Sequence, residues 1–120
     1  MKTFPIPETD QIRAMLNNSF YELLKEYTEH PPKYDFKKFI TINRQKLVEF
    51  LTANPLEAKT YFQNQNKIVS IANHDIFKIW QEGRNYYVAW MDHGNPRNPR
   101  QFDMLAEAVA EFVLVNYGMY

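Results

Sequence analysis

The chain has 120 residues, no cysteine, and 14 lysine and arginine residues that balance 14 aspartate and glutamate residues. A chain of this length fits one domain, residues 1–120, that buries roughly two thirds of the surface its unfolded form exposes. The missing cysteine excludes disulfides, cysteine-based zinc sites and thiol catalysis, and the balanced charge argues against a dedicated nucleic-acid binder.

A strong helical pattern opens the chain. Apolar side chains recur at three- and four-residue steps from Ile12 to Tyr27, which predicts an amphipathic helix over residues 10–28. Thr9 or a neighbour is placed to cap this helix, and Pro31 and Pro32 cannot continue it. We therefore expect one long helix at the N-terminal end of the domain.

Two shorter helices are predicted next. Asn43 is a good capping residue for a helix over residues 44–53. The sequence Asn-Pro-Leu-Glu at 54–57 then places a proline at the first position of another helix. We expect this helix to end near residue 62, before a run of asparagine and glutamine.

The segment 76–91 predicts a β-hairpin, because two stretches rich in β-branched and aromatic residues flank Glu82-Gly83. Side chains alternate between faces along a strand, so the number of turn residues decides which side chains share a face. An even number segregates the apolar side chains, and we prefer it to an odd number, which would mix both faces. One face then carries Phe77, Ile79, Tyr86, Val88 and Trp90. The other face carries Trp80, Tyr87 and Met91, which need a second cover or a partner.

The rest of the sheet and the last helix follow from the flanking sequence. Residues 67–72 read as a strand before the hairpin, and the Asn-Pro-Arg tripeptide repeated over residues 95–100 reads as a loop after it. Asn98 is suited to cap the last helix and Gly118 to end it. The pattern predicts an α+β fold with N-terminal helices, an antiparallel three- to four-stranded meander and a C-terminal helix packed on the sheet.

Catalytic and metal-binding motifs are missing from the sequence. The histidines His30, His74 and His93 lack the helical spacing of metal ligands. Asp92 and His93 are neighbours in an extended segment, so we interpret them as turn formers. The chain has no glycine-rich phosphate loop and no serine in a nucleophile elbow. We therefore expect no metal, no cofactor and no enzymatic activity, and a small enzyme with a site near Asp92 and His93 is the furthest alternative.

Charge is segregated along the chain although its sum is zero. Residues 33–46 contain five cations and Asp35 as their one acid, whereas Asp103, Glu107 and Glu111 occur in the last twenty residues without any cation. The three acids lie one helical turn apart. We interpret them as a solvated polar face rather than a divalent-metal site.

Two groups of cations are candidates for nucleic-acid or phosphate binding. Lys37 and Lys38 lie among aromatic residues in the segment 33–42, which we interpret as a fourth, edge strand with solubilising charge. If the Asn-Pro-Arg repeat is extended, its three-residue period puts Arg97 and Arg100 on one side, where they could grip a phosphate or carboxylate. Exposed arginines on a loop are the preferred interpretation.

The expected location is cytoplasmic. No apolar run reaches the ~20 residues that a membrane helix requires, and the first ten residues do not resemble a signal peptide. We therefore expect a soluble protein without membrane contact.

A protein-binding module is the function that this composition favours. Aromatic residues make up 16% of the chain, and Trp and Tyr are typical of interface hot spots. An inhibitor or an immunity protein that neutralises a toxin by occlusion would have these features, although an aromatic-rich core would share them. The predicted partner-binding residues are Lys78, Trp80, Tyr87, Met91, His93, Arg97 and Arg100. A nucleic-acid or phosphate-ligand binder is the alternative.

Overall fold

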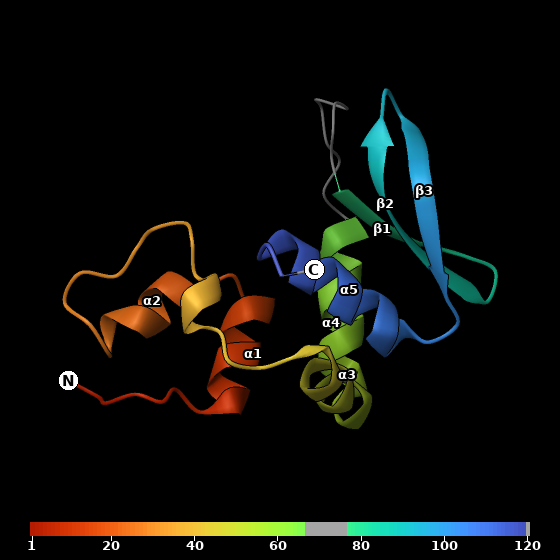
Figure 1. Cartoon of the computed structure of the whole chain (residues 1–120). Coiled ribbons are helices and arrows are strands. Elements are labelled where there is room, and N and C mark those ends of the chain that lie inside the picture. The colour runs from red at the N-terminus through yellow and green to blue at the C-terminus, as the bar shows by residue number, and fades with distance from the viewer. Residues whose placement is uncertain (67–76, 120) are drawn as a thin grey trace.

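Five α-helices, one 3₁₀-helix and three strands make up the described part of the chain, residues 1–66 and 77–119, in this computed structural model (Figure 1). The N-terminal half contains α1 (Glu8–Leu16), α2 (Phe20–Lys25), η1 (Lys37–Phe39), α3 (Arg44–Ala53) and α4 (Pro55–Asn66). The C-terminal half contains β1 (Phe77–Glu82), β2 (Asn85–Asp92), β3 (Asn95–Phe102) and α5 (Leu105–Asn116). The expected α+β fold is confirmed, with three strands in these described residues rather than four.

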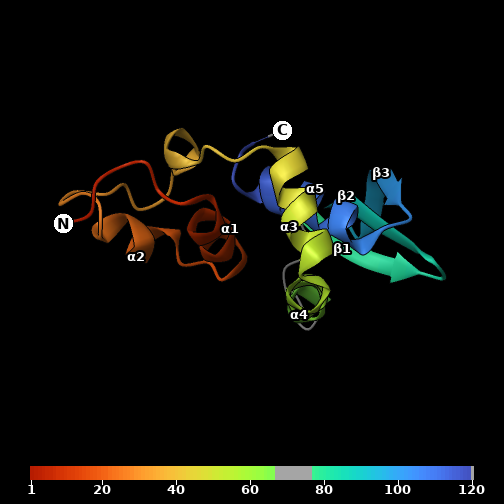
Figure 2. The ribbon, with the colours of Figure 1, turned by 90° about the horizontal axis from the view of Figure 1, so that it is seen from below.

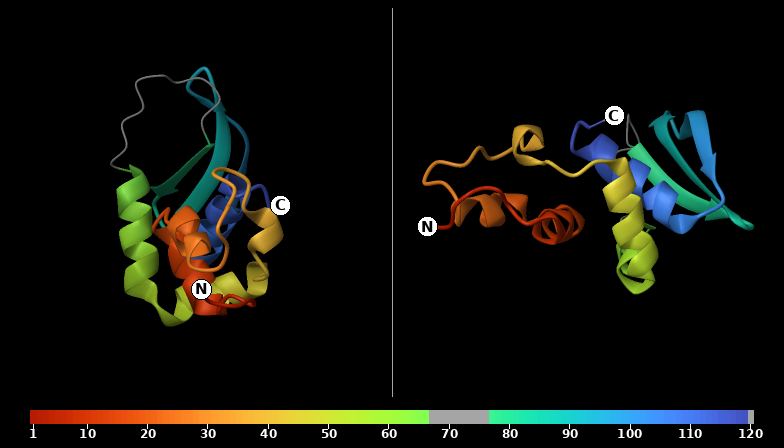
Figure 3. Two further views of the ribbon diagram at one scale, coloured as in Figure 1. Left: turned by 90° about the vertical axis from the view of Figure 1, so that its left-hand side faces the viewer. Right: turned by 60° about the horizontal axis from the view of Figure 1, so that its bottom comes forward.

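The elements follow one another along the long dimension of a molecule whose extents are 46, 32 and 23 Å. Figures 2 and 3 show α1 and α2 at one end, the sheet at the other, and α3, α4 and α5 between them. Helix α5 packs against all three strands and also against α3 and α4. The C-terminal helix is therefore the central layer of the fold.

The core is one continuous cluster of buried apolar side chains that reaches from α1 to β2. Burial of apolar surface is the main favourable term in folding, and here it joins both ends of the molecule. The largest apolar members that are less than 2% exposed are Phe20, Leu24, Leu47, Leu51, Ile79, Val88, Val109 and Val113.

The first helical pattern is interrupted, so the predicted single helix over residues 10–28 is wrong. Helix α1 ends at Leu16 and α2 begins at Phe20, with Asn18 between them in the left-handed conformation at φ 54°. Asparagine adopts this conformation more readily than most residues and breaks a helix there. The predicted cap is also displaced, because α1 begins at Glu8 after Pro7.

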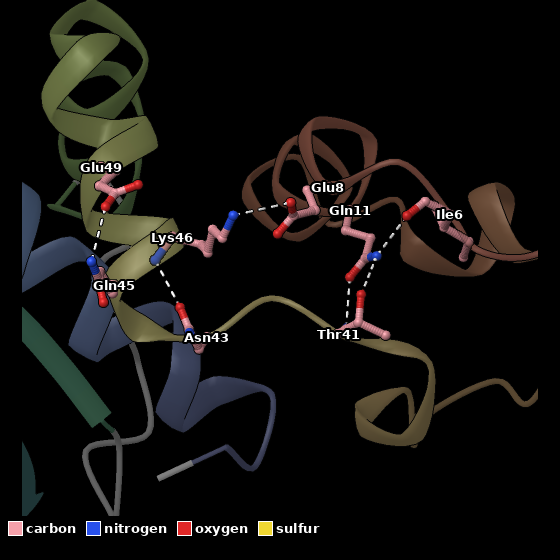
Figure 4. Close-up of polar contacts among 8 residues, drawn as sticks. All are labelled: Ile6, Glu8, Gln11, Thr41, Asn43, Gln45, Lys46 and Glu49. Atoms are coloured by element: carbon pink, nitrogen blue, oxygen red, sulfur yellow. Dashed lines mark hydrogen bonds and ion pairs between the residues drawn. The ribbon is translucent and has the colours of Figure 1, made fainter.

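Residues 33–42 form η1 and an extended segment instead of the predicted edge strand. The side chain of Gln11 in α1 provides the hydrogen bonds that a neighbouring strand would have offered (Figure 4). Gln11 is fully buried. Its Oε1 accepts from the Thr41 backbone N–H at 2.8 Å, and its Nε2 donates to the Ile6 carbonyl at 2.8 Å and to Thr41 Oγ1 at 2.9 Å.

Replacement of Gln11 by alanine is expected to lower the free energy of unfolding by about 2–4 kcal/mol, because a buried group that loses its partner costs about 1–3 kcal/mol. Urea unfolding followed by circular dichroism measures this. The matched control is Gln45→Ala, because Gln45 is exposed and its Nε2 donates to Glu49 Oε1 at 3.1 Å. An equal loss of stability in the two variants would contradict the bridging role of Gln11.

The two short helices of the N-terminal half form where predicted. Asn43 caps α3, since its Oδ1 accepts a hydrogen bond from the Lys46 N–H at 2.9 Å (Figure 4). Helix α4 begins at Pro55, as expected, and continues to Asn66, past the predicted end near residue 62.

The hairpin has the even-numbered turn that segregates its side chains. Gly83 and Arg84 connect β1 to β2, one residue further along than the predicted Glu82-Gly83. Gly83 has φ 61°, as the first central residue of a type II′ turn requires. The register pairs Phe77 with Trp90, Ile79 with Val88 and Trp80 with Tyr87. The predicted division of side chains between the faces is confirmed.

The third strand is β3, the segment that was predicted to be a loop and a helix cap. It pairs with β2 through a type I′ turn whose two residues, His93 and Gly94, have φ 50° and 84°. Pro96 and Pro99 fit here because β3 is an edge strand, where a missing N–H costs no ladder bond. The predicted strand at 67–72 lies outside the described residues.

Helix α5 consequently begins later than predicted and ends as predicted. Its N-cap is Met104, not Asn98. Gly118, at φ 75°, donates to the Val115 carbonyl, and Met119 donates to the Leu114 carbonyl at 2.7 Å. These two bonds form a Schellman motif, which a glycine at this position favours.

Candidate functional site

A stacked pair of aromatic side chains lies on the sheet face away from the helices. The rings of Trp80 and Tyr87 have centroids 5.6 Å apart and planes inclined by 19°. Both side chains are half-buried and lie outside the hydrophobic core. The indole Nε1 of Trp80 donates to Glu82 Oε1 at 3.2 Å, which holds the indole ring in place. The pair is thus an ordered aromatic surface.

The opposite face of the sheet is covered by α4 and α5. Phe77 stacks on Phe112 of α5 with centroids 5.3 Å apart, and Tyr86 meets Phe62 of α4 edge-on at 5.5 Å. The alternation of side chains therefore leaves four predicted residues on the face where no described helix packs. We call this surface the open face; its residues are Lys78, Trp80, Tyr87 and Met91.

The other three predicted residues lie elsewhere. His93 is in the β2–β3 turn, with its Nε2 3.6 Å from Asp92 Oδ1 and with side chains that are 78% and 45% exposed. This separation is longer than a hydrogen bond, and the geometry fits the predicted role of Asp92 and His93 in forming the turn. Arg97 and Arg100 are on β3, on the side of the helices.

A bulge in β3 turns both arginines to that side. Residues three apart in a regular strand point to opposite faces. Here Arg97 pairs with Trp90 and Arg100 pairs with Val88, so one extra residue of β3 lies between them. Asn98, at φ 46°, is part of this irregularity. The arginines share a side, as expected for an extended repeat, although the cause is a bulge.

Glu111 is buried between two arginines from other elements. It is 3% exposed, and its Oε2 accepts from Arg100 Nη1 of β3 at 2.6 Å, while its Oε1 accepts from Arg44 Nη2 of α3. The prediction of a solvated polar face is wrong for this residue. Its cations come from outside the helix, so the local sequence around Glu111 gives no sign of them.

Loss of the two arginines should destabilise the protein more than loss of the carboxylate. The double variant Arg44→Ala/Arg100→Ala leaves the buried carboxylate of Glu111 without a cation, at a cost of about 3–5 kcal/mol. Glu111→Gln leaves arginines that still reach water, since their side chains are 45% and 66% exposed, so we expect about 1–2 kcal/mol. Urea unfolding of both variants, with Arg84→Ala as the control, compares their losses in free energy of unfolding. A larger loss in Glu111→Gln than in the double variant would contradict the prediction.

A cleft lies between this part of the sheet and α5. We call it the arginine cleft; its volume is about 440 Å³. Among the side chains that line it are Phe77, Trp90, Arg97, Arg100, Glu111 and Val115. Trp90 is 49% exposed because α5 covers Val88 but does not extend over the indole ring. The cleft therefore combines an aromatic wall with two cations.

A second cleft, of about 890 Å³, lies between α1 and α2 on one side and α4 and α5 on the other. Its lining is rich in tyrosine: Tyr21, Tyr34, Tyr61 and Tyr117. Burial raises the pKa of Tyr61 above its usual value, and burial raises the pKa of Tyr117 to about 12. Both hydroxyls stay protonated at neutral pH, so they act as hydrogen-bond donors and not as bases.

The raised pKa of Tyr117 makes the protein less stable in alkali. Above pH 10 the unfolded chain releases this proton and the folded chain keeps it until about pH 12, so the free energy of unfolding falls as pH rises through that interval. Between pH 10 and 11 the free energy of unfolding of Tyr117→Phe should fall by up to about 1 kcal/mol less than that of the wild type. Urea unfolding at both pH values measures this. The control Tyr34→Phe, whose ring is 90% exposed, should leave the fall unchanged.

The basic residues of the N-terminal half are separated from the arginine cleft. Lys37 and Lys38 are on η1, on the opposite side of the layer of α3 and α5 from β3 (Figure 2). Phe36 and Phe39, the aromatic residues that flank Lys37 and Lys38, pack against the core and are not free to stack on bases. Lys46 lies 3.3 Å from Glu8 (Figure 4). Lys37 and Lys38 thus form no single basic surface with Arg97 and Arg100.

Comparisons with protein-family models, with curated proteins and with solved structures found no match to this chain. None of the helices formed by residues 1–66 and 77–119 is long and apolar enough to cross a membrane. Within those same residues, histidine and acidic side chains form no group of three that could hold a metal ion.

Proposed function

We propose that this chain is a protein-binding module that contacts its partner through the open face. The observation that carries the proposal is the stacked pair of Trp80 and Tyr87, held in place outside the core. Ordered Trp and Tyr side chains provide large contact areas at low entropic cost, which is why they dominate the energetics of many interfaces.

The open face also indicates the chemistry of the partner. Lys78 is exposed and has no ion pair among the described residues, and it lies two residues from Trp80 on the same face. An apolar patch with a carboxylate at its margin would complement this surface. Binding of this kind occludes the partner's surface, which is how an inhibitor or an immunity protein works. A cytoplasmic location is part of the proposal, and the cysteine-free sequence is compatible with it.

The nucleic-acid alternative has less support. Its four cations belong to two elements, Lys37 and Lys38 to η1 and Arg97 and Arg100 to β3, which lie on opposite sides of the layer of α3 and α5 (Figure 2). A phosphate backbone would need these charges along one track.

Truncation of Trp80 should abolish most of the affinity for the partner. Affinity capture from the source cell with the wild-type chain provides candidate partners, each of which is then purified and titrated. We expect Trp80→Ser to raise the dissociation constant for the partner about 30-fold or more, as for a hot spot that contributes about 2 kcal/mol to binding.

The matched control is Tyr34→Ser, which removes an aromatic ring that is 90% exposed at the other end of the molecule. It should leave the dissociation constant within about twofold, and circular dichroism should show both variants folded. A captured protein that binds Trp80→Ser as tightly as the wild type would refute the open face as the contact surface. So would the absence of any partner that binds the purified wild-type chain.

A further inference from the structure

The arginine cleft has the dimensions of a small-molecule site. Its volume of about 440 Å³ is within the range of roughly 300–1,000 Å³ that such sites have. It lies on the helix side of the sheet, away from the open face, so an inference about it does not depend on the proposed protein partner. Phe77 and Val115 provide apolar walls, and the arginines provide charge.

The charge in the cleft is positive. Arg97 is exposed and has no ion-pair partner among residues 1–66 and 77–119. Arg100 is fixed by Glu111 through one Nη1 contact of 2.6 Å, and its guanidinium group has further N–H donors available. Glu111 is itself shared with Arg44. An anion that enters the cleft therefore meets more positive than negative charge, with one arginine already held in position.

An aromatic ring lies beside these cations. Trp90 is 49% exposed and contacts Phe77, with ring centroids 5.1 Å apart and planes inclined by 50°. The register places Trp90 directly opposite Arg97. A flat ring can pack on the exposed indole while a group attached to it reaches the guanidinium.

We propose that the arginine cleft binds a small aromatic molecule that carries an anionic group, a carboxylate or a phosphate. Arg97 and Arg100 hold the anion, and the ring packs against Trp90. The bulge at Asn98 serves this site, because without it the two arginines would point to opposite faces. A left-handed residue in a bulge beside a cleft fits the general occurrence of such features at binding sites.

Titration with four simple probes tests the proposal, with the side-chain NMR signals of Arg97, Arg100 and Trp90 as the readout. Benzoate and phenyl phosphate share a ring and differ in the anion, phenol has the ring without the charge, and inorganic phosphate has the charge without the ring. We expect benzoate or phenyl phosphate to bind with a dissociation constant on the order of 1 mM, the range for molecules this small. Phenol and inorganic phosphate should bind at least about tenfold more weakly.

The variant Arg97→Gln should raise the dissociation constant of the tighter-binding probe about tenfold or more. Arg84→Gln is the matched control, since it removes the same charge from the exposed β1–β2 turn, and it should leave binding unchanged. Comparison of benzoate with phenyl phosphate identifies the anion. The proposal is overturned if neither benzoate nor phenyl phosphate shifts the three NMR signals, or if phenol binds as tightly as these two probes. It is also overturned if Arg97→Gln and Arg84→Gln bind the tighter probe with the same dissociation constant.

Discussion

A single buried carboxylate, that of Glu111, links the central layer of the fold to the elements on both sides of it through ion pairs with two arginines. Glu111 lies in the helix that forms the central layer, and its arginine partners come from α3 on one side and from β3 on the other. Removing a carboxylate from water is costly unless cations and hydrogen bonds compensate it. The directional contact between Glu111 and Arg100 adds to the apolar packing of α5 on the sheet and favours one position of β3 relative to α5.

The ion pair of Glu111 with Arg100 helps explain why the sequence of β3 forms a strand although its strand propensity is low. Asn-Pro-Arg-Asn-Pro-Arg has low strand propensity, and its two prolines cannot donate to a ladder. At the edge of the sheet, however, neither proline needs to donate, and the extra residue is accommodated at Asn98. Arg100 then reaches Glu111 with a contact of 2.6 Å. The ion pair between Arg100 and Glu111 thus joins β3 to α5 despite the weak strand propensity of this sequence, and Arg97 lines the same cleft.

Features of the fold that depend on residues close together in the sequence were predicted correctly. The cap at Asn43, the helix start at Pro55 and the division of hairpin side chains follow from neighbouring residues, and all three are present. Two of the misses depend on partners in other elements. Gln11 accepts a hydrogen bond from the Thr41 backbone, 30 residues away, and Glu111 pairs with Arg44, 67 residues away, and with Arg100 of the preceding strand. A sign of burial, though not of the cations, was available for Glu111, because the turns that follow it are apolar all round. Burial there requires a cation.

The two proposed binding sites lie on opposite faces of the sheet. Alternation along β2 sends Tyr87 to the open face and Val88 and Trp90 to the helix side, so the proposed protein contact and the proposed ligand contact would involve different side chains of one strand. Arg100 lines the cleft and also pairs with Glu111 of α5, so its substitution would change stability and the proposed binding together. Arg97 has no structural partner in the described residues. A change in ligand affinity caused by substitution of Arg97 can therefore be attributed to a lost contact with the ligand rather than to a change in stability.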